Sequence, residues 1–178
     1  MLGALDYNVV PQSDFAIDAA AETGTSFAAN ALLKAQHAAD LTGLPAIADD
    51  SGLVVDALHG RPGVYSARYA GSNATDADNI DKLLREMAQV ADTERGAAFH
   101  CVICMVTPGA GEPLFAEGSW RGRIARQRSG AGGFGYDPVF IDPELGVTAA
   151  ELSSNEKNQR SHRGKALAEL LRQLKSQS

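Results

Sequence analysis

The spacing of apolar residues predicts that helices and strands alternate along the chain. Apolar positions follow the helical period over 26–41, with Thr25 or Ser26 as the N-cap and Gly43 as the stop signal, which predicts a helix. The same period predicts helices over 75–91, where Thr75 is the N-cap, and over 161–175. Shorter apolar segments predict strands at 7–10, 46–48, 53–58, 97–106, 114–120, 122–127 and 139–141. This alternation predicts an α/β fold in which 97–127 forms an antiparallel meander.

Two polar segments interrupt this pattern. Residues 49–52, Asp-Asp-Ser-Gly, read as a turn between two short strands. Residues 129–138 are too rich in glycine to form regular structure. Loops of this kind often carry binding and catalytic residues, so both segments are candidates for a site.

Composition indicates a single globular domain covering 1–178. The chain has 178 residues, of which 44% are hydrophobic and 21% are charged, which excludes a disordered or fibrous protein. No apolar run approaches the roughly 20 residues that span a bilayer, and the first ten residues show no basic segment typical of a secretory signal. We therefore expect a cytoplasmic protein. The net charge of −6 disfavours nucleic acid and anionic membranes as partners.

The charges are distributed unevenly between the two ends of the chain. Residues 1–60 contain one base and eight acids, whereas residues 119–178 contain ten bases and six acids. A fold that joins these segments places carboxylates opposite cations. Such an arrangement suits a metal ion with a small polyanion, and it also suits purely structural ion pairs.

Cys101 and Cys104 form a C-x-x-C pattern that could indicate a redox pair or half of a zinc site. They lie in the predicted strand 97–106, where residues three positions apart point to opposite faces. We therefore expect both thiols to fill the core.

Asp49 and Asp50 are the best catalytic candidates by position. They follow the predicted strand 46–48, and open α/β sheets bind ligands at the carboxyl ends of strands. Phosphoryl chemistry in water uses one carboxylate to hold Mg²⁺ and another to orient or deprotonate the attacking water. An ordinary Asp-Ser-Gly turn explains the same residues equally well.

The glycine-rich segment formally matches the dinucleotide fingerprint at Gly130, Gly132 and Gly135, but the context excludes that motif. The fingerprint requires a strand before it and a helix opening within it, whereas here a strand follows. The glycines still permit close approach to a ligand, and Phe134 offers a ring face to a base.

A group of cations precedes the last predicted helix. Lys157, His162 and Arg163 would form an anion site near a helix N-terminus. A capped helix with solvated charges is the alternative.

Four motifs together resemble one family. They are Ala-Asp-Asp-Ser-Gly-Leu at 48–53, Pro-Gly-Val-Tyr-Ser-Ala-Arg at 62–68, Gly-Gly-Phe-Gly-Tyr-Asp-Pro at 132–138 and Ser-His-Arg-Gly at 161–164. In this order and spacing they are similar to the inosine/xanthosine triphosphate pyrophosphatases. A nucleotide-clearing hydrolase of the Maf type would not explain the last motif.

The resemblance implies a fold, an activity and a site. The implied fold is a mixed twisted central sheet with flanking helices and two lobes around a substrate cleft, assembled as a homodimer. The implied reaction is Mg²⁺-dependent hydrolysis of ITP, dITP and XTP to the nucleoside monophosphate and pyrophosphate. Asp50 matches the carboxylate that activates water, and Glu22, Asp49 and Asp50 match metal ligands. The implied substrate contacts are Asn30, Lys34, Ser51, Arg68, Phe134, Gly135, Tyr136, Asp137, Lys157, His162 and Arg163.

The chemistry of the base agrees with this assignment. A 6-keto purine presents an acceptor at O6 where adenine presents a donor, so a donor from His162 or Arg163 favours the keto form.

The chain departs from the family pattern at its N-terminus. Family members begin with a strand and a Ser/Thr-x-Asn-x-x-Lys loop that holds the triphosphate, and Met1 to Leu5 align after that segment. We expect a true start upstream of Met1. The alternative is a variant with weakened phosphate binding, which would be a non-catalytic purine nucleotide-binding protein.

Overall fold

The computed structural model describes residues 8–109 and 111–177. In these residues, four α-helices, α1 (Phe27–Thr42), α2 (Asp76–Glu86), α3 (Ser154–Arg160) and α4 (His162–Gln177), accompany four strands, β1 (Ala46–Val55), β2 (Gly96–Val106), β3 (Leu114–Ile124) and β4 (Phe140–Ile141). Among these residues, no helix is both long and apolar enough to cross a membrane.

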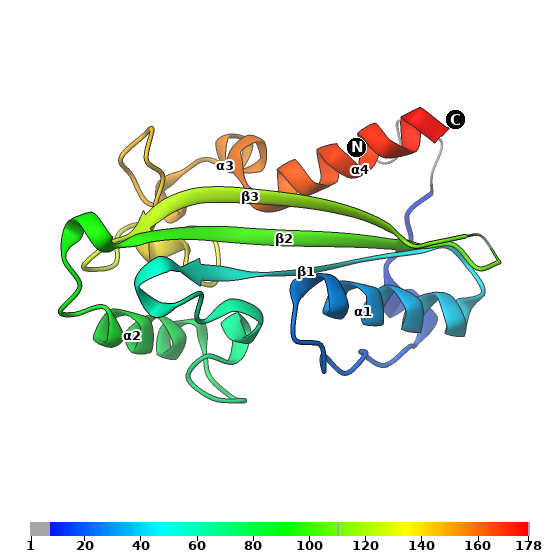
Figure 1. Cartoon of the computed structure of the whole chain (residues 1–178), viewed down its shortest axis with the longest axis horizontal. Coiled ribbons are helices and arrows are strands. Elements are labelled where there is room, and N and C mark those ends of the chain that lie inside the picture. The colour runs from blue at the N-terminus through cyan, green and yellow to red at the C-terminus, as the bar shows by residue number, and fades with distance from the viewer. Residues whose placement is uncertain (1–7, 110, 178) are drawn as a thin grey trace.

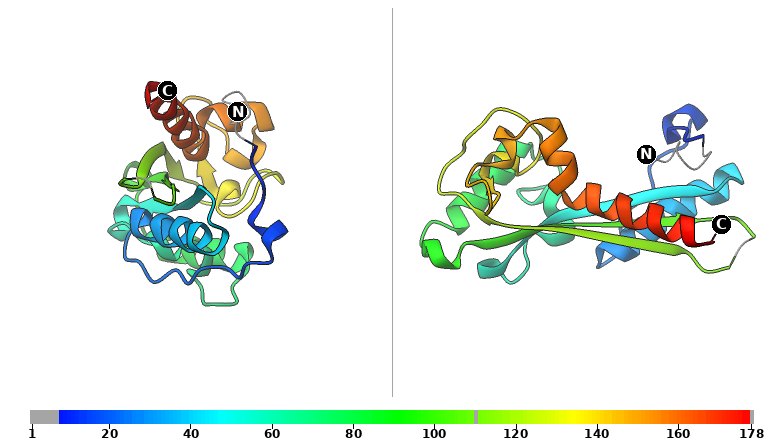
Figure 2. Two further views of the ribbon diagram at one scale, coloured as in Figure 1. Left: turned by 90° about the vertical axis from the view of Figure 1, so that its right-hand side faces the viewer. Right: turned by 90° about the horizontal axis from the view of Figure 1, so that it is seen from above.

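The strands form one twisted sheet in the order β1-β2-β3-β4. β1 to β3 run along the length of the molecule, with α1 and α2 on one face and α3 and α4 on the other (Figures 1 and 2). This confirms the expected α/β fold with a central sheet and flanking helices. Every pairing in the described part of the chain is antiparallel, so the sheet is not mixed there. For β2 and β3 the physical reason is the short connection between them, since a hairpin connection makes neighbouring strands antiparallel.

Side-chain alternation along β2 divides the core between the two faces. Cys101, Ile103 and Met105 pack with Ala166 and Leu170 of α4. Val102, Cys104 and Val106 pack against α1 on the opposite face. A third and larger cluster fills the other end of the sheet beneath α2, around Leu53, Leu83, Phe99, Trp120 and Phe140. Both cysteines are buried and free, as expected of packing residues.

β1 is longer than the sequence pattern predicts. Asp49, Asp50, Ser51 and Gly52 do not form a turn, because β1 pairs with β2 without a break from Ala46↔Val106 to Val55↔Ala97. The backbone hydrogen bonds of this ladder outweigh the turn preference of the polar residues. The two aspartates therefore lie in the middle of a strand and not at its carboxyl end.

Other expected boundaries also change. β3 is one continuous strand where two were expected, and α2 ends at Glu86 instead of near residue 91. Residues 8–10 of the first expected strand are not in a strand, and Tyr7 lies outside the described residues. The helix over 26–41 is confirmed: the Ser26 side chain caps α1, and Gly43 ends it with a φ of 68°.

Candidate functional site

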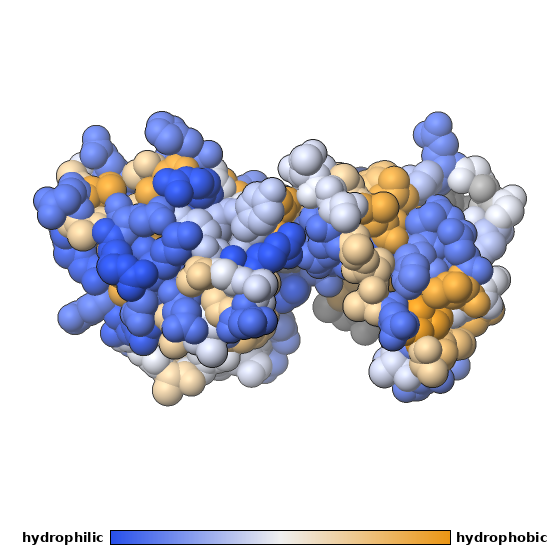
Figure 3. Space-filling view, turned by 90° about the horizontal axis from the view of Figure 1, so that it is seen from below, coloured by the Kyte–Doolittle hydropathy of each residue, from blue (hydrophilic) through white to orange (hydrophobic). Residues whose placement is uncertain are grey.

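The molecule is hollowed between two lobes (Figure 3). Hydrophilic residues predominate on the lobe to the left of the hollow, and hydrophilic and hydrophobic residues are mixed on the lobe to its right. Two groups of side chains gather near the middle of β1. One group contains carboxylates and cations, and the other surrounds an exposed aromatic ring.

The first group is built around the ammonium of Lys34. Lys34 Nζ donates to Asp50 Oδ1 at 2.9 Å and to Glu22 Oε1 at 3.0 Å. The second Asp50 oxygen accepts from Asn30 Nδ2 at 3.2 Å. Arg68 Nη1 donates to the other Glu22 oxygen at 3.0 Å. We call these five residues the charged cluster. It brings together residues that the resemblance implied for the site, namely Glu22, Asn30, Lys34, Asp50 and Arg68.

Local structure explains how the charged cluster forms. Asn30 and Lys34 lie one turn apart on α1, so they share the helix face that packs on the sheet. Asn30 is fully buried, and its Oδ1 accepts from the amide of Gly24 at 2.8 Å, which ties the segment carrying Glu22 to the helix. Asp50 points toward α1 because it shares a face of β1 with Ala46 and Ala48, which pack beneath that helix.

Mutual attraction keeps Glu22 and Lys34 ionised. Burial opposes the charge of Glu22, but the hydrogen bonds and charges of Lys34 and Arg68 outweigh it and hold the pKa of Glu22 below its ordinary value. Burial likewise opposes the charge of Lys34, but Asp50 and Glu22 raise the pKa of Lys34 above its ordinary value. At neutral pH Glu22 is therefore an anion and Lys34 a cation.

Asp49 lies on the other face of β1 from Asp50. Its Oδ2 accepts from Arg163 Nε at 3.1 Å and from Ser51 Oγ at 2.8 Å. Burial opposes ionisation of Asp49, but the charge of Arg163 and the hydrogen bonds from Ser51 and Arg163 lower the pKa of Asp49. The expected pairing of Asp49 and Asp50 at one metal is not found, because neighbouring residues of a strand point in opposite directions.

The donor set of the charged cluster suits a hard divalent cation. Glu22 and Asp50 both contact the single ammonium of Lys34, so their carboxylates lie near each other. Mg²⁺ is commonly held by one or two carboxylates together with substrate phosphates, and two carboxylates fit that requirement. Within 8–109 and 111–177, no group of three or more His, Cys, Asp or Glu side chains could hold a metal.

The second group forms a pocket next to the charged cluster. Its lining comes from β1, the turn 63–68, the start of α2, β2, the glycine-rich segment 129–138, α3 and the start of α4. The lining residues are Ser51, Gly52, Leu53, Ser66, Ala67, Asp76, Phe99, Phe134, Gly135, Tyr136, Asp137, Lys157, His162 and Arg163. Phe134 is 60% exposed, which is unusual for a large aromatic residue. The Nζ of Lys157 lies 4.5 Å from its ring centroid, and the Cζ of Arg163 lies 5.4 Å from it.

Buried partners hold the glycine-rich loop in place. Asp137 accepts the amide of Phe134 at 2.8 Å and is ion-paired with Lys157. Tyr136 is buried and donates its hydroxyl to the carbonyl of Ser66 at 2.8 Å. Gly135 has a φ of 59°, a conformation that favours glycine, and it donates its amide to Asp76 at 2.6 Å.

His162 forms the buried wall of this pocket. It is 7% exposed and stacks on Phe99 with 4.9 Å between ring centroids. Burial, together with the nearby positive charge of Arg163, lowers the pKa of His162 to about 3, so the ring is neutral at pH 7. Its Nδ1 has no hydrogen-bond partner among the described residues. A neutral ring with a free nitrogen can donate to or accept from a ligand in the pocket.

Ser51, another predicted site residue, lies in the second group. Ser51 borders the pocket one residue after Asp50, so β1 connects the two groups directly. The pocket also contains Ser66, Asp76 and Phe99, which were not predicted as site residues. Asp76 follows the N-cap Thr75 and looks like a helix-start residue, and Phe99 looks like a core residue, so neither carries a separate sequence signal.

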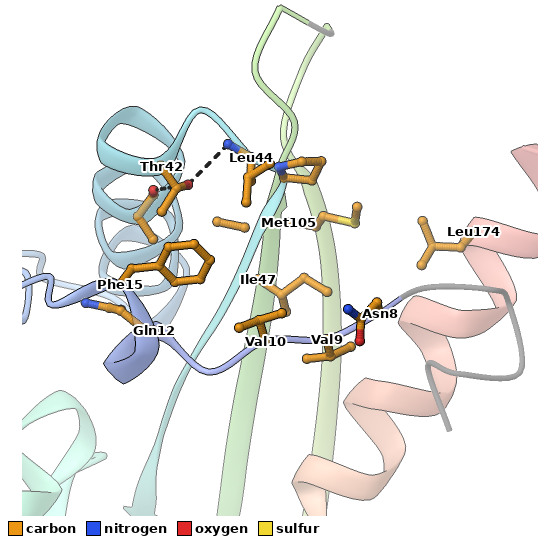
Figure 4. Close-up of a pocket in the computed structure, with 13 residues that line it drawn as sticks. Asn8, Val9, Val10, Gln12, Phe15, Thr42, Leu44, Ile47, Met105 and Leu174 are labelled. Carbon is orange, nitrogen blue, oxygen red and sulfur yellow. Dashed lines mark hydrogen bonds between the residues drawn. The ribbon is translucent and has the colours of Figure 1, made fainter.

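A second pocket lies at the end of the sheet where β1 begins and β2 ends (Figure 4). Phe15, Ile47, Met105 and Leu174 point into it, and none of the residues that line it is charged. It therefore lacks the cations that a phosphate-containing ligand requires.

Known proteins share both the sequence and the fold. A model of the Ham1 family matches residues 1–173. The dITP/XTP pyrophosphatase of Pectobacterium atrosepticum is 54% identical over 177 residues, which cover 99% of this chain and 90% of that protein. The dITP/XTP pyrophosphatase of Halorhodospira halophila is 55% identical over 172 residues, which cover 96% of this chain and 86% of that protein.

Solved structures of related proteins share the fold of this chain. A HAM1 protein from Coxiella burnetii superposes with a TM-score of 0.88 and 50% identity over 94% of this chain and 85% of that chain. The Ham1 protein of Staphylococcus aureus superposes with a TM-score of 0.91 and 44% identity over 98% of this chain and 90% of that chain. These likenesses confirm the resemblance carried by the four motifs, and the chain belongs to the Ham1 family.

Proposed function

We propose that this chain hydrolyses non-standard purine nucleoside triphosphates, namely ITP, dITP and XTP, to the nucleoside monophosphate and pyrophosphate. Relatives named dITP/XTP pyrophosphatase share between 52% and 55% of its residues over nearly the whole chain. Such a reaction removes deaminated purines from the nucleotide pool.

The observation that carries this proposal is that the charged cluster and the pocket around Phe134 lie next to each other along β1. The charged cluster offers Lys34 and Arg68 to phosphates and Glu22 and Asp50 to a metal. The neighbouring pocket offers Phe134 for stacking and Arg163 and His162 for the edge of a base. A purine nucleotide has an aromatic end and a polyanionic end, and it matches this pair of regions.

Asp50 is the residue we assign to activation of water. It is buried, and Lys34 and Asn30 hold both of its oxygens. Substrate phosphates compete for Lys34, and drawing that ammonium toward them frees one oxygen of Asp50 to orient or deprotonate water. Glu22 and Asp50 would hold Mg²⁺, which neutralises phosphate charge when it is bound.

The polar groups of the pocket explain a preference for 6-keto bases. Arg163 can only donate, so it pairs with O6 of hypoxanthine or xanthine. The amino group of adenine would leave that donor unpaired in a partly desolvated pocket, which lowers affinity.

The test measures pyrophosphate release from ITP, XTP, GTP and ATP with Mg²⁺. We expect release from ITP and XTP well above ATP, and a loss of about 100-fold or more in kcat for Asp50→Asn, because general-base catalysis contributes that much. Asp92→Asn is the matched control, since Asp92 pairs with Arg126 on the surface. A folded chain that binds ITP but releases no pyrophosphate would replace the proposal with a non-catalytic purine nucleotide-binding protein.

Three further proposals rest on the resemblance. They are Mg²⁺ as the metal, a homodimer and a cytoplasmic location. Replacing Mg²⁺ by Ca²⁺ in the assay tests the first, light scattering of the purified protein tests the second, and cell fractionation tests the third.

A further inference from the structure

The environment of Asp49 sets it apart from the charged cluster. Its carboxylate faces α4 and accepts hydrogen bonds from Arg163 and Ser51, with a longer one from Cys101 Sγ at 3.9 Å. Asp50 meets Lys34 and Asn30 on the other face of β1. A carboxylate directed away from the cluster is not arranged to share a metal with Asp50.

The contact with Asp49 fixes the orientation of Arg163. The guanidinium is planar, and its Nε is the atom that donates to Asp49, at 3.1 Å. Its Cζ lies 5.4 Å from the centroid of the exposed Phe134 ring. In the described part of the chain, Nη1 and Nη2 of Arg163 have no hydrogen-bond partner. Because Nε is held by Asp49, these two groups remain available to a ligand in the pocket beside Phe134.

This geometry suits one edge of a purine in particular. O6 and N7 of a 6-keto purine form a pair of acceptors that arginine binds in a bidentate manner. Adenine keeps N7 but presents a donor at position 6, so one of the two hydrogen bonds is lost. Bidentate recognition depends on the direction of the guanidinium plane, and a residue that holds Nε sets that direction.

We propose that Asp49 is a positioning residue that orients Arg163 toward the O6 and N7 atoms of the base and thereby sets the preference for 6-keto over 6-amino purines. This inference rests on the proposed function for its substrate class. Ser51 supports the arrangement by donating to the same oxygen of Asp49 that Arg163 contacts. Asp49 acts on base selection, whereas the neighbouring Asp50 acts on water.

The experiment compares Asp49→Asn, Asp49→Ala, Arg163→Ala and the double variant Asp49→Ala with Arg163→Ala. Initial rates with ITP and ATP give kcat and KM for each nucleotide over a range of Mg²⁺ concentrations. Equilibrium binding of IMP and AMP in the presence of EDTA measures base selection without metal or chemistry. Asp92→Ala is the control for loss of an Asp–Arg pair, because Asp92 and Arg126 pair at 2.7 Å away from the pocket.

We expect the ITP to ATP ratio of kcat/KM to fall about tenfold or more in the Asp49 variants, as for loss of a hydrogen bond to a charged group. The lower ratio comes from a higher KM for ITP, and the Mg²⁺ concentration that the variants require stays equal to that of the unaltered protein. The IMP to AMP binding ratio falls in parallel. The double variant is no worse than Arg163→Ala alone, because Asp49 acts through Arg163. The near-isosteric Asp49→Asn keeps the test valid should Asp49→Ala fail to fold.

Two results would overturn the inference. Equal losses of kcat on ITP and ATP with a raised Mg²⁺ requirement would make Asp49 a metal ligand. An unchanged IMP to AMP ratio in Asp49 variants, with a changed ratio in Arg163→Ala, would show that Arg163 needs no positioning by Asp49. Should the unaltered chain release no pyrophosphate, the proposed reaction fails, and the IMP and AMP measurements still decide the role of Asp49.

Discussion

Burial of His162 makes the stability of this protein depend on pH in a defined direction. The pKa of His162 is about 3 in the folded chain, because burial and the charge of Arg163 disfavour the imidazolium, whereas the exposed group has a pKa of 6.5. Between these values the unfolded chain binds more protons than the folded chain, so the free energy of unfolding falls as pH falls. The contribution of His162 is fully present above pH 6.5 and is lost progressively toward pH 3.

The size of the effect follows from the two pKa values. Each pH unit within that interval removes about 1.4 kcal/mol from the free energy of unfolding. Lowering the pH from 7.5 to 4.5 crosses two units below the unfolded pKa and therefore costs about 3 kcal/mol. This loss is a large fraction of the stability of a typical domain.

Urea denaturation measures this quantity, with Trp120 as the probe. Trp120 is the one tryptophan in the sequence and is buried in the core, so its fluorescence changes on unfolding. His162→Gln removes the titrating group, and the difference between the unaltered chain and this variant isolates the contribution of His162 from those of the other histidines. A difference that stays constant within about 0.5 kcal/mol between pH 7.5 and pH 4.5 would refute the reasoning.

Three further predictions concern stacking, backbone approach and thiol reactivity. Phe134→Ala is expected to raise KM for ITP about 5-fold to 100-fold, as for loss of a stacked base, with little change in thermal unfolding because the ring is largely exposed; an unchanged KM would exclude stacking. Gly118→Ala places a Cβ against the backbone at the start of α4, so we expect this variant to lower the free energy of unfolding, measured in urea, by about 1–3 kcal/mol. Ser119 is exposed, and the control variant Ser119→Ala should leave the free energy of unfolding unchanged. Burial raises the pKa of Cys101 and Cys104 to about 11, so iodoacetamide at pH 8 should label neither in the native chain and both in urea, as mass spectrometry would show; native labelling would contradict the burial.

Periodicity and local signals in the sequence determine much of the secondary structure. The N-cap Ser26 and the stop at Gly43 place α1, and the Thr75 capping box places the start of α2. The alternation of apolar residues along β2 correctly sends Cys101 and Cys104 to opposite faces. These features depend on interactions within a few residues, which the sequence contains in full.

The resemblance also predicted a set of residues that the fold brings together. Glu22, Asn30, Lys34, Asp50 and Arg68 come together in the charged cluster, although the positions span almost fifty residues. The resemblance supplied this set, since spacing along the chain does not measure distance in space.

Tertiary structure alone decided the course of β1 and the separate roles of its two aspartates. Read locally, Asp-Asp-Ser-Gly has turn chemistry, but ten consecutive pairings with β2 hold it extended. Extended backbone sends neighbouring side chains to opposite faces, so Asp49 meets Arg163 while Asp50 meets Lys34. Arg163 stands 114 positions from Asp49 in the sequence, and no local pattern connects them. Sequence names these residues, but only the strand pairing of the folded sheet determines which partner each one meets.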